Sequence, residues 1–202
     1  SECIFDDKNT LPNCKIGVKG NPTIAIWGDS HADSLFVAID EALKESGNTG
    51  VFHALSACPP AMGELKAAIA KDPKQFEKCQ QFKKLVWDEI SSNPNIKEII
   101  LIGRWSRYFN KVVPANQATD QMVADEYKHH IVDTVCTLTN LDKSVYLVAP
   151  IPEMGQHVPR ELAKALLVNQ SNMDISSTLA DYKSYNQLVL GALATAKKKC
   201  QA

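Results

Sequence analysis

The sequence lacks the features that mark a membrane span, a nucleic-acid surface or a nucleotide-binding loop. No run approaches the ~18 consecutive apolar residues that a membrane-spanning helix needs. The formal net charge is only −1 over 202 residues, which argues against broad binding to nucleic acid. The glycine-rich patterns of phosphate and dinucleotide sites are also absent. Since the chain has no initiator Met and no signal-peptide pattern, we expect it to be part of a longer polypeptide.

The six cysteines show no metal-binding pattern. None forms a CxxC or a Cys/His pair at zinc spacing, so we expect no metal site. An even number of cysteines in loops and at element ends favours disulfides and an oxidising compartment. Six buried free thiols in a cytosolic protein are the alternative. The pairing that we predict is Cys3–Cys14, Cys58–Cys79 and, by elimination, Cys136–Cys200.

Apolar runs alternate with helical patterns along the chain. The expected strands are 23–27, 51–55, 98–102 and 144–149, and the expected helices are 33–46, 73–92, 120–138 and 179–199. Strands that alternate with helices predict a mainly parallel sheet with helices on both faces, a three-layer α/β/α sandwich. A last crossover helix should feed another strand, so we expect a fifth strand to be missing at the C-terminus.

The strongest chemical signal lies between the first strand and the first helix. There Gly28, Asp29 and Ser30 follow a buried strand directly, and the glycine permits a tight turn. A serine in this place has the backbone N–H groups and the positive dipole end of a helix beside it, which favours a nucleophile and a developing oxyanion. The alternative is that Asp29 or Ser30 only caps the helix.

The run Gly28-Asp29-Ser30 resembles the first block of the SGNH (GDSL-like) hydrolase superfamily. In its longer form, Trp-Gly-Asp-Ser-His-Ala at 27–32, it resembles the SGNH domain fused to membrane-bound acyltransferases that O-acylate bacterial surface glycans. Segments 56–60, 103–105 and 150–153, each after a predicted strand, agree with that family. The likeness implies a disulfide-containing leader at 1–22 and an SGNH domain at 23–202 that is incomplete at its C-terminus.

The resemblance also implies a function. Ser30 would take an acyl group, expected to be acetyl, and pass it to a hydroxyl of a surface glycan such as lipopolysaccharide O-antigen. The expected partners are that glycan and an N-terminal membrane acyltransferase domain of the same polypeptide, with no nucleic acid. The domain itself needs no cofactor, because the membrane partner would use the acyl donor, acetyl-CoA. The implied location is the periplasmic side of an inner membrane.

Two oxyanion donors of the family are not matched. Where the family has Gly-x-Asn-Asp, this chain has Gly-Arg-Trp-Ser at 103–106, and the second-block glycine is replaced by Ser-Ala at 56–57. Arg104 could supply charge instead, and Trp105 an indole N–H or a stacking face for a sugar. A surface ion pair and core packing are the alternatives for these two residues. Around catalytic Ser30 we therefore predict an oxyanion-binding or substrate-binding set of Asp29, His31, Gly103, Arg104 and Trp105.

The family's Asp-x-x-His block, in which His is the general base, is not found in the sequence. None of the five histidines follows an Asp at that spacing. His157, after the fourth strand, is a possible substitute, and His31 is expected to support the nucleophile rather than deprotonate it. We therefore expect this chain to be inactive alone, with its Asp and His beyond Ala202. The alternative functions are a carbohydrate esterase of the same fold and a non-catalytic glycan-binding domain.

Overall fold

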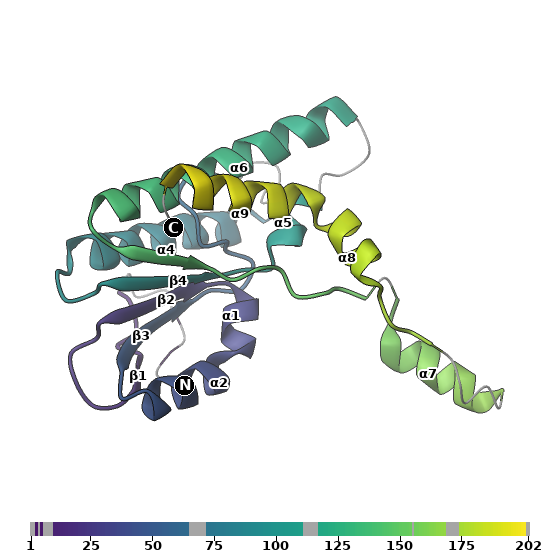
Figure 1. The fold of residues 1–202 in the computed structure, drawn as a ribbon, viewed down its shortest axis with the longest axis horizontal. Helices are drawn as coiled ribbons and strands as arrows, with labels where there is room; N and C mark the ends of the chain where they lie inside the picture. Colours follow the sequence, from purple (N-terminus) through teal and green to yellow (C-terminus); the bar gives the residue numbers. More distant parts are fainter. Residues whose placement is uncertain are drawn as a thin grey trace.

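The computed structural model describes residues 3, 5, 10–64, 72–110, 117–154, 156–168 and 174–200. Within them, one five-stranded sheet has the order β1-β3-β2-β4-β5 (Figure 1). The strands are β1 (Lys15–Gly17), β2 (Ile24–Gly28), β3 (Thr49–Ala54), β4 (Glu98–Ile102) and β5 (Ser144–Leu147). β2 to β5 are parallel, and β1 pairs antiparallel with β3. The carboxyl ends of the four parallel strands therefore meet at one edge.

Helices cover both faces of this sheet. The helices in the described ranges are α1 (Ser30–Ser34), α2 (Phe36–Glu45), α4 (Pro73–Ser92), α5 (Trp105–Asn110), α6 (Gln117–Asn140), α7 (Val158–Leu167), α8 (Leu179–Tyr185) and α9 (Gln187–Cys200). α1 and α2 lie on one face, and α4, α5, α6 and α9 lie on the other (Figure 1). None of the helices in the described ranges is both long enough and apolar enough to cross a membrane.

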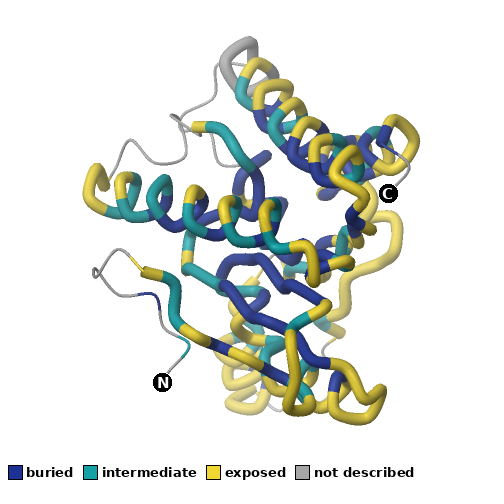
Figure 2. The backbone as a smooth tube through the Cα atoms, turned by 90° about the vertical axis from the view of Figure 1, so that its left-hand side faces the viewer, coloured by how far each residue is buried: buried dark blue, intermediate teal, exposed yellow. Residues whose placement is uncertain are grey.

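Side chains of the central strands alternate between two apolar cores. In β2, Ile24 and Ile26 belong to the core under α1 and α2, while Ala25 and Trp27 belong to the larger core under α4, α6 and α9. Period-two alternation with both faces buried is expected of a strand inside a three-layer sandwich. Figure 2 shows the central strands as buried and the helices as buried only on their inner sides. The predicted α/β/α fold is confirmed.

The four predicted strands are present, and the structure adds one strand that the sequence analysis did not predict. This is β1, which lies within the segment assigned to the leader and pairs Lys15 with Val51 of β3. A three-residue strand with a single buried residue, Ile16, carries too little alternation to be recognised. The segment at 1–22 thus contributes directly to the sheet of the domain.

The helices depart from the prediction in two ways. Two expected helices are interrupted, one at Leu35 between α1 and α2 and the other at Asn186 between α8 and α9. α5 and α7 were not predicted at all. α5 has only six residues, and α7 has Pro159 in its first turn, where proline is compatible with a helix although it suggests a loop in the sequence.

All three predicted disulfides are present. The Cα–Cα distances are 4.8 Å for Cys3–Cys14, 5.4 Å for Cys58–Cys79 and 4.6 Å for Cys136–Cys200. The second bond ties the loop after β3 to α4, and the third ties α6 to the end of α9.

We expect loss of the Cys136–Cys200 bond to destabilise the fold more than loss of Cys3–Cys14, because it closes a longer loop. In the chain-entropy account the cost is about 4 kcal/mol for a separation of 64 residues and about 3 kcal/mol for a separation of 11. Guanidinium unfolding followed by circular dichroism should rank Cys136→Ser/Cys200→Ser below Cys3→Ser/Cys14→Ser in stability. The reverse order would contradict this account.

Candidate active site

Ser30 is the first residue of α1 and directly follows the turn at the end of β2. Its side chain is partly exposed, in contrast to the buried residues that precede it. The turn requires glycine at position 28, because a Cβ atom there would lie 2.3 Å from the carbonyl oxygen of Ile102 and 2.4 Å from Cβ of Ala32. This close approach brings the carboxyl end of β4 beside Ser30.

Asp29 anchors the serine turn through three hydrogen bonds. It is 1% exposed, and its carboxylate accepts hydrogen bonds from the backbone N–H of His31 at 2.8 Å, the backbone N–H of Arg104 at 2.8 Å and the hydroxyl of Tyr108 at 2.7 Å. Burial, with the negative charge of Asp29, raises the pKa of Tyr108 well above its usual value, so the phenol keeps the proton it donates. The structure shows the capping role of Asp29, and its predicted contact with oxyanion or substrate stays a prediction.

Trp105 lies in the core of the domain. Its side chain is 0% exposed and belongs to the larger core, and its indole N–H donates to the carbonyl of Val148 at 2.8 Å. It offers a ligand neither an N–H nor a ring face, so the core alternative is the one observed. The reason is that α5 begins at this residue and turns the indole inward. Gly103 just before it is buried, and a Cβ atom there would lie 3.2 Å from Pro60.

Arg104 points toward the loop after β5 and pairs with Glu153. Its Nε donates to Oε1 of Glu153 at 3.0 Å, a second guanidinium nitrogen donates to Oε2, and the hydroxyl of Ser106 donates to Oε1 as well. Arg104, with help from Ser106, lowers the pKa of Glu153 despite the opposing effect of burial. The Arg104 charge is thus already compensated, which limits its value for binding an oxyanion.

Glu153 is the site residue that the sequence reasoning missed. It lies in segment 150–153, for which the sequence analysis predicted a likeness to the family but no role for any single residue. Arg104 follows β4 and Glu153 follows β5. Residues that follow parallel strands meet at the same edge of the sheet, so the sequence could have predicted that these two opposite charges lie close together. The two residues are 49 positions apart, so local spacing alone does not pair them.

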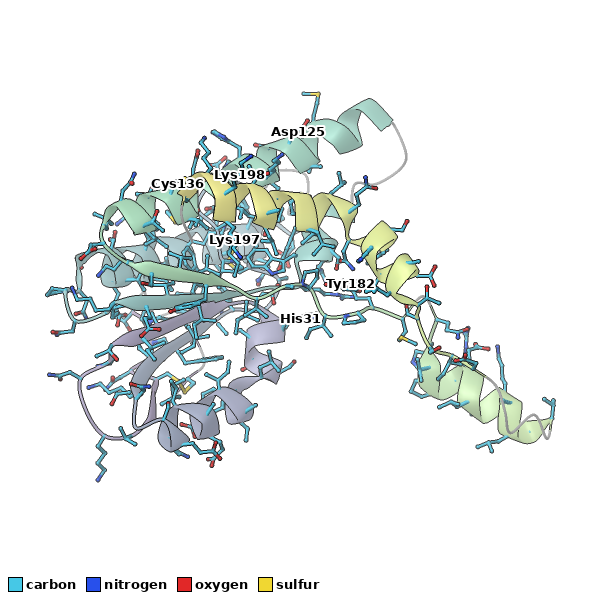
Figure 3. The ribbon with its side chains drawn as sticks, viewed as in Figure 1. His31, Asp125, Cys136, Tyr182, Lys197 and Lys198 are labelled. Carbon is cyan, nitrogen blue, oxygen red and sulfur yellow. A yellow bond between two sulfur atoms is a disulfide. The ribbon has the colours of Figure 1, made fainter. Side chains whose placement is uncertain are left out.

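Figure 3 shows His31 on α1, the helix that directly follows β2. Its Nδ1 is buried and has no hydrogen-bond partner among the described residues, and its charge contributes to the lowered pKa of Glu153. The side chain therefore stands next to Ser30 and within electrostatic reach of Glu153. Its role in supporting the nucleophile stays a prediction.

Each of the other four histidines lies near another polar group. His53 is 3.2 Å from Glu89, His129 is 2.9 Å from Asp133, His130 is 3.8 Å from Glu126, and His157 caps α7 by accepting from the N–H of Arg160. Figure 1 shows α7 projecting away from the part of the sheet that carries α1. The structure therefore does not support His157 as a substitute base.

A groove of about 460 Å³ begins at Glu153 and runs along α8. We call it the α8 groove; its lining includes Glu153, Gln156, Asp181, Tyr182, Tyr185 and Asn186. The hydroxyl of Tyr182 donates to the carbonyl of Pro150 at 2.9 Å, which fixes α8 against the loop after β5. Ser30 is not among the lining residues. Glu153 in the lining pairs with Arg104, whose backbone N–H donates to Asp29, the residue before Ser30.

A family model described as the SGNH domain fused to AT3 domains matches residues 2–202. The matched region contains Ser30, every residue predicted around it and all five described strands. No curated protein matches the chain.

The Arg104–Glu153 pair should make stability depend on acid pH. Because the pKa of Glu153 is lowered in the folded state, the pair stabilises the fold above the unfolded pKa and loses that contribution as pH falls through the folded pKa. Glu153→Gln should therefore lower the free energy of unfolding by about 1 kcal/mol at pH 7, allowing for the partial exposure of Arg104. The difference in free energy of unfolding between this variant and wild type should shrink on acidification.

Urea unfolding from pH 7 down to pH 3 measures this difference. The matched control is Glu45→Gln, the same change on an exposed position of α2. If the free energies of unfolding of Glu153→Gln and wild type differed by the same amount at every pH in that range, the pair would not be the source of the acid sensitivity.

Proposed function

The chain belongs to the family of SGNH domains that are fused to AT3 domains, and from that membership we propose that it transfers an O-acyl group, acetyl, to hydroxyls of a bacterial surface glycan such as lipopolysaccharide O-antigen. The observation that carries the proposal is the position of Ser30. It follows a buried parallel strand, begins a helix and is partly exposed, at the sheet edge where ligands bind in such folds.

The reaction proceeds in two balanced steps. The Ser30 oxygen forms a bond to the acyl carbon, the bond from that carbon to the donor's leaving group breaks, and the Ser30 proton passes through a base to the leaving group. A glycan hydroxyl then attacks the same carbon, the ester bond to Ser30 breaks, and the base transfers the proton of the glycan hydroxyl to the Ser30 oxygen. With water in place of the glycan, the same site would be a carbohydrate esterase.

Backbone N–H groups at the strand ends are our proposed oxyanion donors. Ala57, in the turn after β3, has φ of 56°, a left-handed conformation that favours glycine. Its N–H has no hydrogen-bond partner in the described part of the chain. This supports Ala57 as a replacement for the unmatched donor.

The sequence contains no Asp-x-x-His, so we propose that the base comes from outside residues 1–202. A serine hydroxyl is a weak nucleophile until a base accepts its proton, so these residues alone should turn over little. We further propose that the acyl group arrives from a membrane acyltransferase domain of the same polypeptide, N-terminal to this chain, which uses acetyl-CoA, and that the domain faces the periplasm. A purely glycan-binding role is the alternative, favoured by the compensated charge of Arg104.

Acyl-enzyme formation tests the nucleophile directly. We expect prolonged incubation with an activated ester, nitrophenyl acetate, to add one acetyl group to the peptide that contains Ser30, slowly because the base is absent, and Ser30→Ala to abolish it. Mass spectrometry of proteolytic fragments measures the adduct. Ser34→Ala is the matched control, an exposed serine of the same helix that should leave labelling intact. Labelling that persists in Ser30→Ala would refute the assignment.

A further inference from the structure

The wall of the α8 groove contains a buried polar atom without a partner. Asn186 is 1% exposed, and its Nδ2 donates to the carbonyl of Tyr182 at 3.0 Å. Its Oδ1 is buried and accepts no hydrogen bond from any described residue. Buried amide oxygens are normally paired, so this unpaired oxygen is an acceptor that a hydroxyl of a ligand in the groove could satisfy.

The surrounding residues suit a hydroxyl-rich ligand with an apolar face. Tyr185 on the same helix is 47% exposed and supplies an aromatic ring, and Gln156 across the groove is an exposed amide. The hydroxyl of Tyr182 is already occupied by Pro150, so this ring is held in place. Aromatic faces beside amide and carboxylate groups offer both stacking and hydrogen bonds to a sugar ring.

The charges in the groove argue against an acidic ligand. Glu153 is neutralised by Arg104, whereas Asp181 forms no ion pair among the described residues. Hydrogen bonds from Thr178 lower the pKa of Asp181, so its carboxylate stays ionised. A negative group on the ligand would be repelled, while the hydroxyls of a neutral sugar can donate to these acceptors.

We propose that the α8 groove binds a neutral pyranose ring of the acceptor glycan, with Oδ1 of Asn186 accepting a hydrogen bond from a sugar hydroxyl and Tyr185 contacting the ring. This inference rests on the proposed transfer to a glycan. The groove volume of about 460 Å³ lies in the usual range for small-molecule sites, roughly 300–1,000 Å³.

The groove is also connected to the serine site. Glu153 lines it and holds Arg104, whose backbone N–H donates to Asp29, the residue before Ser30. Figure 3 shows His31 and Tyr182 at the same end of the sheet, on α1 and α8 respectively. A sugar seated along α8 would therefore present a neighbouring part of the glycan toward Ser30.

The test measures sugar binding by the 202-residue chain carrying Ser30→Ala. Methyl glucoside, methyl galactoside and methyl rhamnoside are titrated separately and followed by backbone amide chemical shifts, with methyl glucuronide as the acidic counterpart. We expect at least one neutral glycoside to bind with shifts centred on α8, and the glucuronide to bind more weakly. Asn186→Leu, which keeps the approximate size but removes the acceptor, should weaken binding about tenfold.

Two further variants keep the test decisive. Tyr185→Ala changes an exposed side chain and should also weaken binding, even if Asn186→Leu proved unstable in a thermal melt. Tyr146→Ala on β5 removes a tyrosine of similar exposure, 50%, outside the groove and should leave binding unchanged. Failure of all neutral glycosides to bind, or equal binding by the Tyr185 and Tyr146 variants, would overturn the proposal.

Measuring acetylation of Ser30 in the wild-type chain tests the groove proposal separately from the proposed acyl transfer on which it rests. Acetylation without sugar binding would overturn the groove and leave acyl transfer standing. Sugar binding that depends on Asn186 and Tyr185, without acetylation of Ser30, would support the groove in a glycan-binding domain that is not an acyltransferase.

Discussion

The carboxylate of Asp29 accepts hydrogen bonds from the start of α1, from the residue after Gly103 and from α5, and it does so while almost wholly buried. A buried carboxylate is costly unless its lone pairs are satisfied. The ends of β2 and β4 and the first turn of α5 must therefore come together around it. Ser30 and Arg104 are positioned by that convergence.

Asp29 lies between Ser30 on one side of the site and Arg104 on the other. On one side, Ser30 begins α1 next to a glycine that admits the carbonyl of Ile102. On the other, the fixed backbone of Arg104 sends its side chain to Glu153, which opens onto the α8 groove. The family membership points to acyl chemistry at the first side, and the unpaired amide oxygen of Asn186 points to glycan contact at the second.

Local pattern was enough to predict the strands at the centre of the sheet, the serine turn and the disulfide pairs, because each depends on burial or on spacing along the chain. The features it missed depend on tertiary contacts. The direction of Trp105 depends on where α5 begins, and the partner of Arg104 lies 49 residues away. Asn186, which lines the groove, lies where the helix predicted at 179–199 breaks, and nothing in the periodicity marks that break.

The Cys136–Cys200 bond closes part of the chain into a covalent ring that contains β5, α7 and α8. A peptide bond cut within this ring would leave both pieces joined through sulfur, with α9 still held against α6. The backbone between β5 and α8, which includes the projecting α7, is therefore not the only covalent connection between α6 and the C-terminal helix.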